Sequence, residues 1–188
     1  MTARNLLFMA LPPPAVREAL LKQVRLNRWD HRLGGAMFPA CNWHQSLSGL
    51  HSATPEMRSR MLRAGAKVAA HACTLLLDGM TSEAHGSRWY WTFRARTPPP
   101  GFGPLLASVA AALAAEGIET LSGHTPHVTL SYWAPEPLGT WRMEPIPWTL
   151  TELRLVVSGG HPYTYKTLGQ WPLLPARDDQ PPAQATLF

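Results

Sequence analysis

The order of apolar and polar positions in the first quarter of the chain predicts a strand, a helix and a second strand. Residues 5–11 form an almost continuous apolar run, which is typical of a buried strand. Pro12–Pro14 follow, and proline suits the first turn of a helix. Apolar residues then recur at helical spacing, so a helix is expected over 14–25, and a loop leads to a strand expected over 43–50.

The same order of elements recurs in the second half of the chain. Aromatic and β-branched residues predict a strand over 89–93, and three prolines end it. A helix over 103–116 follows, with Gly117 as its stop, and a loop leads to a strand over 127–133. A repeat of this size indicates two similar lobes about a pseudo-two-fold axis.

The remaining segments complete the two sheets. Thr54 can cap the helix that follows it, because a threonine side chain accepts a hydrogen bond from a free backbone N–H of the first turn. The C-terminal segment is polar and rich in proline, and it is expected to be a flexible tail. The expected segments are a helix over 55–72, strands over 73–78, 149–158 and 163–171, a single domain over 1–174 and a tail over 175–188.

Composition places the chain among soluble globular proteins. Its 188 residues suffice for one domain with a real interior, and 45% of them are apolar. No apolar run is long enough to cross a bilayer, so a cytoplasmic protein without a membrane partner is expected. The net charge of +5, carried mostly by arginine, suits an anionic partner such as RNA or a nucleotide. Base composition of the genome would account for the arginines equally well.

The third element of each series carries the same short motif. His44-Gln45-Ser46-Leu47-Ser48 and His127-Val128-Thr129-Leu130-Ser131 both read His-any-hydroxyl-Leu-Ser. Side chains at i and i+2 share one face of a strand, so each motif offers an imidazole beside a hydroxyl. In a cleft between two such strands, one imidazole can accept a proton while the other donates one, and hydroxyls can hold an anion. This is the equipment of a phosphodiester-cleaving site.

Simpler readings of these histidines exist. A single His-x-Thr is common and more often belongs to a packed or surface histidine, but its repetition at a matching position favours a functional pair. His124 and His127 form a His-x-x-His, which can resemble a pair of metal ligands. Pro126 between them prevents the helical geometry that such a pair needs, so no metal site is expected.

On these residues the chain resembles the two-histidine (2H) phosphoesterase superfamily. It is most similar to the bacterial RNA 2′,3′-cyclic phosphodiesterases, which are often labelled 2′-5′ RNA ligases. The resemblance covers about 5–174 and includes the opening Leu-Phe-x-Ala-Leu-Pro segment, both histidine motifs and a late tyrosine-rich strand over 163–168. Pro126-His127-Val128-Thr129-Leu130 is its most specific part.

The resemblance implies an α/β fold of the α+β type, with two pseudo-symmetric lobes of antiparallel sheet flanked by helices and the active-site cleft between them. It also implies hydrolysis of the 2′,3′-cyclic phosphate of an RNA end or cyclic nucleotide to a 2′-phosphomonoester, without a cofactor and with 2′-5′ ligation as the reverse reaction. His44 would be the proton donor and His127 the proton acceptor. Ser46 and Thr129 would hold phosphate oxygens.

The chain departs from the family pattern at two places. Gly49-Leu50-His51 stands where the family often has Phe-Leu-Gly, and Tyr132 stands where it often has an arginine that binds substrate phosphate. Tyr132 could instead stack on a base as a substrate-binding residue, or it could be an ordinary core or rim aromatic. The alternative to an enzyme is therefore a binder of RNA ends or nucleotides with the same fold and no turnover.

The end of the tail offers a separate hypothesis. Gln184, Leu187 and Phe188 resemble the Gln-x-x-Leu-Phe peptide by which bacterial proteins dock on the DNA sliding clamp. A five-residue match in a polar tail also arises by chance.

Overall fold

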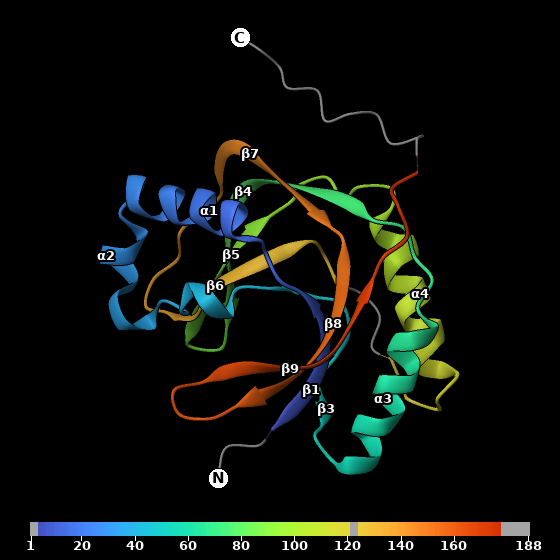
Figure 1. Cartoon of the computed structure of the whole chain (residues 1–188). Helices are drawn as coiled ribbons and strands as arrows, with labels where there is room; N and C mark the ends of the chain where they lie inside the picture. Colours follow the sequence, from blue (N-terminus) through green and yellow to red (C-terminus); the bar gives the residue numbers. More distant parts are fainter. Residues whose placement is uncertain (1–3, 121–123, 178–188) are drawn as a thin grey trace.

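The computed structural model describes residues 4–120 and 124–177, which form two antiparallel sheets and four α-helices. Figure 1 shows the sheets in the middle of the molecule, with one pair of helices on either side. This is the α+β arrangement of two lobes that the sequence predicts. The helices are α1 (Pro14–Leu26), α2 (Trp29–Leu33), α3 (Pro55–Lys67) and α4 (Phe102–Ala114).

The first sheet is built around the N-terminal strand. This strand, β1, pairs with β8 on one side and with two two-residue strands, β2 and β3, on the other, and β9 pairs with the far side of β8. β2, which follows His44, therefore lies at an edge of the sheet. The strands are β1 (Asn5–Ala10), β2 (Gln45–Ser46), β3 (His51–Ser52), β8 (Glu152–Gly159) and β9 (Thr164–Pro172).

The second sheet has the order β6-β5-β4-β7. Its members are β4 (Cys73–His85), β5 (Arg88–Arg94), β6 (His127–Ala134) and β7 (Trp141–Leu150). β6, which begins at the second histidine, is an edge strand in this sheet, as β2 is in the other. Each histidine motif therefore lies at a sheet edge, where backbone and side chains are free to contact the other lobe.

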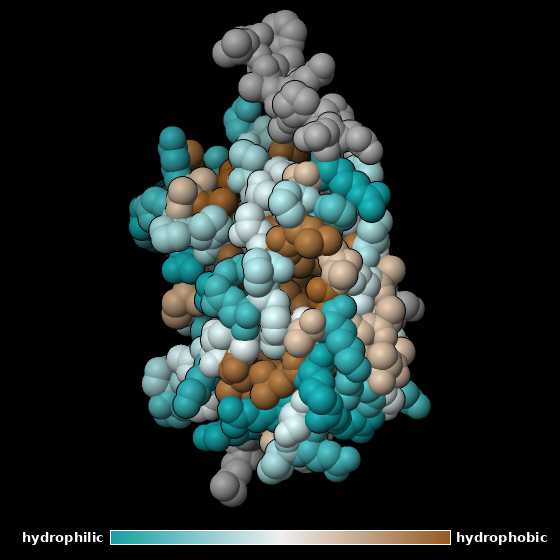
Figure 2. Space-filling model, turned by 45° about the vertical axis from the view of Figure 1, so that its right-hand side comes forward, coloured by the Kyte–Doolittle hydropathy of each residue, from teal (hydrophilic) through white to brown (hydrophobic). Residues whose placement is uncertain are grey.

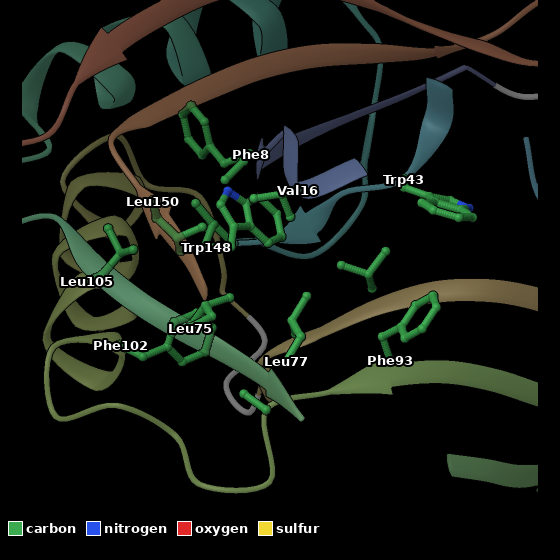
Figure 3. Close-up of a cluster of buried hydrophobic side chains, with 14 of the residues drawn as sticks. Phe8, Val16, Trp43, Leu75, Leu77, Phe93, Phe102, Leu105, Trp148 and Leu150 are labelled. Atoms are coloured by element: carbon green, nitrogen blue, oxygen red, sulfur yellow. The ribbon is translucent and has the colours of Figure 1, made fainter. Parts of the chain in front are cut away.

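One hydrophobic core joins the two sheets. Phe8 of β1 belongs to the same buried cluster as Leu75 of β4 and Trp148 of β7, and Figure 3 shows these side chains together. Trp43 packs edge-on against Phe93 of β5, with ring centroids 6.0 Å apart. Burial of such large side chains is the main stabilising contribution to a fold. Because Trp43 precedes His44 directly, this packing also fixes where the first motif lies.

The predicted helices are confirmed with adjusted ends. α1 and α4 match the expected helices within two residues, and Pro14 is the first residue of α1. Thr54 caps α3 by accepting a hydrogen bond from the backbone N–H of Met57 at 3.1 Å. α3 ends at Lys67 instead of 72, because Val68 adopts an extended conformation.

The strand expected over 43–50 is wrong as a single element. Only Gln45 and Ser46 form a ladder with β1, and His44 lies just before it. The ladder ends because the hydroxyl of Ser48, instead of a strand carbonyl, accepts the backbone N–H of Phe8 at 2.8 Å. This side-chain acceptor replaces the backbone pairing that a longer strand would need.

The strand expected over 149–158 is confirmed as β8 from Glu152 onward, but it begins too early, because residues 149 and 150 belong to another strand. The chain instead forms β7, which the sequence did not predict, then breaks at Thr151 and continues as β8. Two prolines, Pro145 and Pro147, conceal the strand pattern of β7. They are tolerated there because β7 is an edge strand, whose outer N–H groups need no partner. β4 likewise extends past its predicted end at 78 to His85.

Two further findings concern the surface and the chain end. No helix of the described residues is long and apolar enough to cross a membrane. Figure 2 shows one face of the molecule, where apolar patches interrupt a mostly hydrophilic surface. Of the predicted tail only 175–177 are described, so the clamp-like peptide ending at Phe188 lies outside the described residues.

Candidate active site

The imidazole of His44 is held by the backbone just before it. Its Nδ1 lies 2.8 Å from the carbonyl oxygen of Asn42, and the side chain is buried, with 7% of its surface exposed. A carbonyl can only accept, so Nδ1 carries the proton of this hydrogen bond. Nε2 is then the nitrogen free to exchange a proton with another group.

His127 is held in the same way in the other lobe. Its Nδ1 lies 2.8 Å from the carbonyl oxygen of Thr125, again two residues earlier in the chain. The residue is half-buried at the start of β6, with Arg94 of β5 opposite it in the ladder. The two motifs therefore share the hydrogen bond that holds each ring. In both rings Nε2 is the exchangeable nitrogen.

Gln45 joins the two histidine segments. Its Oε1 accepts the backbone N–H of His127 at 2.6 Å, and its Nε2 donates to the carbonyls of Ser46 at 2.8 Å and Thr125 at 3.3 Å. The Thr125 carbonyl is the one that also holds the ring of His127. The side chain of Gln45 is fully buried. It therefore links the edge of the first sheet to the edge of the second at the two histidine motifs.

Burial dominates the ionisation of both imidazoles. It lowers the pKa of His44 to about 4, against an opposing effect of the Asn42 carbonyl, and the charge of nearby His127 lowers this pKa further. The pKa of His127 is also lowered by burial, which outweighs the raising effect of the Thr125 carbonyl. The charges of Arg94 and His124 lower the pKa of His127 further, and Glu83 opposes them. In the unliganded protein both rings are neutral at pH 7.

The two predicted hydroxyls occupy different environments. Ser46 is half-buried and lines the main cavity together with His44. Thr129 is almost completely buried on β6, two residues after His127, where strand alternation places both on one face. Neither His127 nor Thr129 belongs to the lining of that cavity. The structure thus joins the two motifs through Gln45, but only the first motif lines the cavity, whose remaining wall comes from other residues.

Five aromatic side chains contribute to that wall, namely Phe38, Tyr132, Trp133, Tyr163 and Tyr165. The cavity has a volume of about 720 Å³, which is within the range of small-molecule sites. Tyr132 lines it, and its ring meets that of Phe38 edge-on at 5.8 Å. Tyr163 and Tyr165 continue the series, and Tyr165 meets the ring of His44 edge-on at 5.0 Å.

Several of these residues were not predicted as site residues. Tyr163 and Tyr165 alternate, so they share a face near the start of β9, and this spacing was a usable signal. Phe38 lies in a loop between two short 3₁₀ helices, where no pattern marks it. His124 also lines the cavity, and burial lowers its pKa. In the described part of the chain, no three His, Cys, Asp or Glu side chains group as metal ligands would.

Of the comparisons with known proteins, the one with solved structures gives matches. No family model and no curated protein matches the sequence. Among solved structures, E. coli LigT complexed with ATP is 20% identical, with a TM-score of 0.72, covering 92% of this chain and 98% of that chain. LigT complexed with 3′-AMP is 24% identical, with a TM-score of 0.70, covering 91% and 98%. The protein has the LigT fold.

A third structure, of a phosphoesterase, shares that fold. It is 24% identical, with a TM-score of 0.68, and the match covers 91% of this chain and 99% of the other. LigT has also been crystallised with NADP⁺ and with phosphate. At 20–24% identity these matches establish the LigT fold over nearly the whole chain, as the resemblance in the sequence predicts. The chemistry has to be argued from the residues of the site.

Replacement of Gln45 should test the link between the lobes. Gln45→Met keeps the side-chain volume but leaves the N–H of His127 and the carbonyl of Thr125 with fewer partners, which should cost about 2 kcal/mol or more of unfolding free energy. Gln170→Met, at an exposed position of β9, is the matched control and should change little. Urea unfolding measures both variants. Equal stabilities would contradict a structural link through Gln45.

Proposed function

We propose that the protein is a 2H phosphoesterase that hydrolyses 2′,3′-cyclic phosphate ends of RNA to 2′-phosphomonoesters. The observation that carries the proposal is the pair of imidazoles, each held at Nδ1 by the carbonyl two residues before it and joined through Gln45. Two histidines with free Nε2 atoms at one site can donate and accept a proton in the same reaction. The nucleotide and phosphate complexes of LigT, on the same fold, support a phosphate-containing substrate.

The reaction needs one proton transfer at each histidine. His127 takes a proton from water at Nε2 while the water oxygen forms a bond to phosphorus. The bond from phosphorus to the 3′-oxygen breaks, and His44 gives its Nε2 proton to that oxygen. Ser46 and Thr129 donate hydrogen bonds to the non-bridging oxygens of the phosphate. A 5′-hydroxyl in place of water would give a 2′-5′ linkage, which is the ligation that the family resemblance implies.

The substrate itself supplies the charge that the acid needs. The low pKa of His44 leaves its ring neutral at pH 7 before substrate binds. A phosphate anion beside the ring favours the imidazolium form and raises this pKa. The donor is therefore protonated mainly in the complex, where the reaction takes place.

The aromatic wall suits the nucleoside part of the substrate. Tyr132, Phe38 and Tyr163 line the same cavity as His44. Aromatic side chains bind unstacked bases by stacking, with little dependence on the base. In this proposal Tyr132 is the substrate-binding residue and contacts the terminal base. This arrangement favours RNA ends and nucleotides over other cyclic phosphates.

A second candidate function is supported by the same pKa. A protein that only binds RNA ends or nucleotides would have no need of a protonated His44, and the ring is neutral in the unliganded protein at pH 7. Measurement of turnover separates this binder from the enzyme. A binder would retain nucleotide in the cleft without changing it.

Substitution of either histidine should abolish most of the hydrolysis. His44→Ala and His127→Ala should each lower kcat by about 10²–10⁴-fold on a 2′,3′-cyclic-ended oligonucleotide, because each removes one proton-transfer group. His31→Ala, at an exposed position of α2, is the control.

The unmodified protein should remain active in EDTA, because the proposed mechanism uses no metal ion. Nucleotide binding without turnover would establish the binder instead, and activity lost to EDTA and restored by a divalent ion would reject the metal-free mechanism.

The pH dependence should reflect the lowered pKa values. Because kcat/KM reports the free enzyme, its bell should have its maximum below pH 6.5, the ordinary pKa of histidine. Above that maximum the alkaline limb falls as His44 loses its proton, and His44→Ala should remove this limb. His127→Ala should remove the acidic limb. The maximum of kcat should lie at higher pH, since bound phosphate raises both pKa values, and a kcat/KM maximum above pH 7 would contradict this account.

A further inference from the structure

A charged and aromatic surface lies beside the cavity, at the turn between β4 and β5. Arg88, the first residue of β5, places its guanidinium over the ring of Trp133, 3.2 Å from the ring centroid. Trp133 is 56% exposed, which is unusual for so large an apolar side chain, and it also lines the cavity. One face of the guanidinium is therefore covered by the indole. Its opposite face and its in-plane N–H groups remain available.

A second ring series reaches the same turn. Tyr132, inside the cavity, meets Tyr90 of β5 edge-on at 5.2 Å. Tyr90 in turn stacks on His85, the last residue of β4, at 4.7 Å and 27°. Two lines of contact, one through Trp133 and one through Tyr132, thus connect the cavity with the β4–β5 turn. The turn therefore lies next to two residues that line the cavity.

Arg88 differs from neighbouring arginines in having no acidic partner. Arg94, Arg96 and Arg32 form ion pairs with Glu83, Asp78 and Glu136. Among the described residues, Arg88 forms no ion pair, and its guanidinium lies over the ring of Trp133. An exposed guanidinium that is held in place by an indole but not neutralised by a carboxylate favours binding of an anion. Nothing about the fold requires such an arrangement.

We propose that Arg88 and Trp133 form a subsite for the nucleotide that precedes the cyclic-phosphate end of single-stranded RNA. The N–H groups of Arg88 bind the phosphodiester that links this nucleotide to the terminal one, which occupies the cavity. This inference rests on the proposed function, and it makes an oligonucleotide a better substrate than a cyclic mononucleotide. Trp133 holds the guanidinium plane beside the cavity and lowers the entropy lost on binding.

Three substrates of increasing length test the subsite. They are cytidine 2′,3′-cyclic phosphate, its 5′-phosphorylated form and the dinucleotide CpC with a 2′,3′-cyclic phosphate end. The unmodified protein should show a kcat/KM about fivefold higher for the second and third substrates than for the first, as expected of one exposed charge pair. An advantage found only for CpC would assign the contact to the preceding base stacked on the guanidinium.

Two variants and a control complete the experiment. Arg88→Gln should remove the advantage and leave hydrolysis of the mononucleotide unchanged, whereas Arg88→Lys, which keeps the charge but not the plane over Trp133, should keep only part of it. Arg142→Gln, an exposed arginine of β7 at the opposite edge of the same sheet, should change nothing. An advantage that survives Arg88→Gln, or no advantage at all, would overturn the proposal.

Failure of the proposed function gives a different result. In that case the mononucleotide is not hydrolysed by any form of the protein. Titration with the uncyclised dinucleotide CpC bearing a 2′-phosphate then tests the subsite by itself. Tighter binding to the unmodified protein than to Arg88→Gln would support it, and equal binding would overturn it.

Discussion

The site depends on a small network of hydrogen bonds between two sheet edges. Each histidine is fixed by a carbonyl two residues earlier, and Gln45 connects the two segments through the N–H of His127 and the carbonyl of Thr125. Edge strands normally leave such groups unpaired and exposed. Here the two edges satisfy each other, so the polar groups that join the lobes are also those that orient the imidazoles. A change in the relative position of the lobes would therefore misalign the site at once.

The close packing of the two sheet edges also determines the pKa values of the two histidines. Because the rings lie in a buried junction, their charged forms are disfavoured, and the pKa of His44 falls to about 4. In the proposed reaction an anionic substrate would reverse this effect, so that the acid would form where phosphate is bound. The aromatic rings that extend from His44 through Tyr165 to Tyr132 add contact area without adding charge. In the proposed reaction, binding and proton transfer would thus depend on the same desolvated cleft.

The sequence predicted those features that follow from local periodicity. The three longer helices and both histidine motifs belong to this class, since apolar spacing and the i, i+2 rule act within a few residues. The role of Gln45 could not be predicted, because its partners lie in the second half of the chain. Strand alternation relates a residue only to its neighbours in the same strand. β7 was missed because its prolines are acceptable only at an edge, a fact of the tertiary structure. The place of Phe38 in the site could not be predicted either, because it lies in a loop whose position is set by the packing of the two lobes.

The central claim is that both imidazoles are held as Nδ1–H donors in a desolvated junction. Nitrogen-15 NMR of the histidine side chains tests it most directly, with His44 and His127 assigned by single substitution to asparagine. At pH 7 without ligand, both rings should be neutral with the proton on Nδ1, and His44 should titrate only as the pH approaches 4. A proton on Nε2 of either ring, or a His44 that titrates near pH 6.5, would contradict the account.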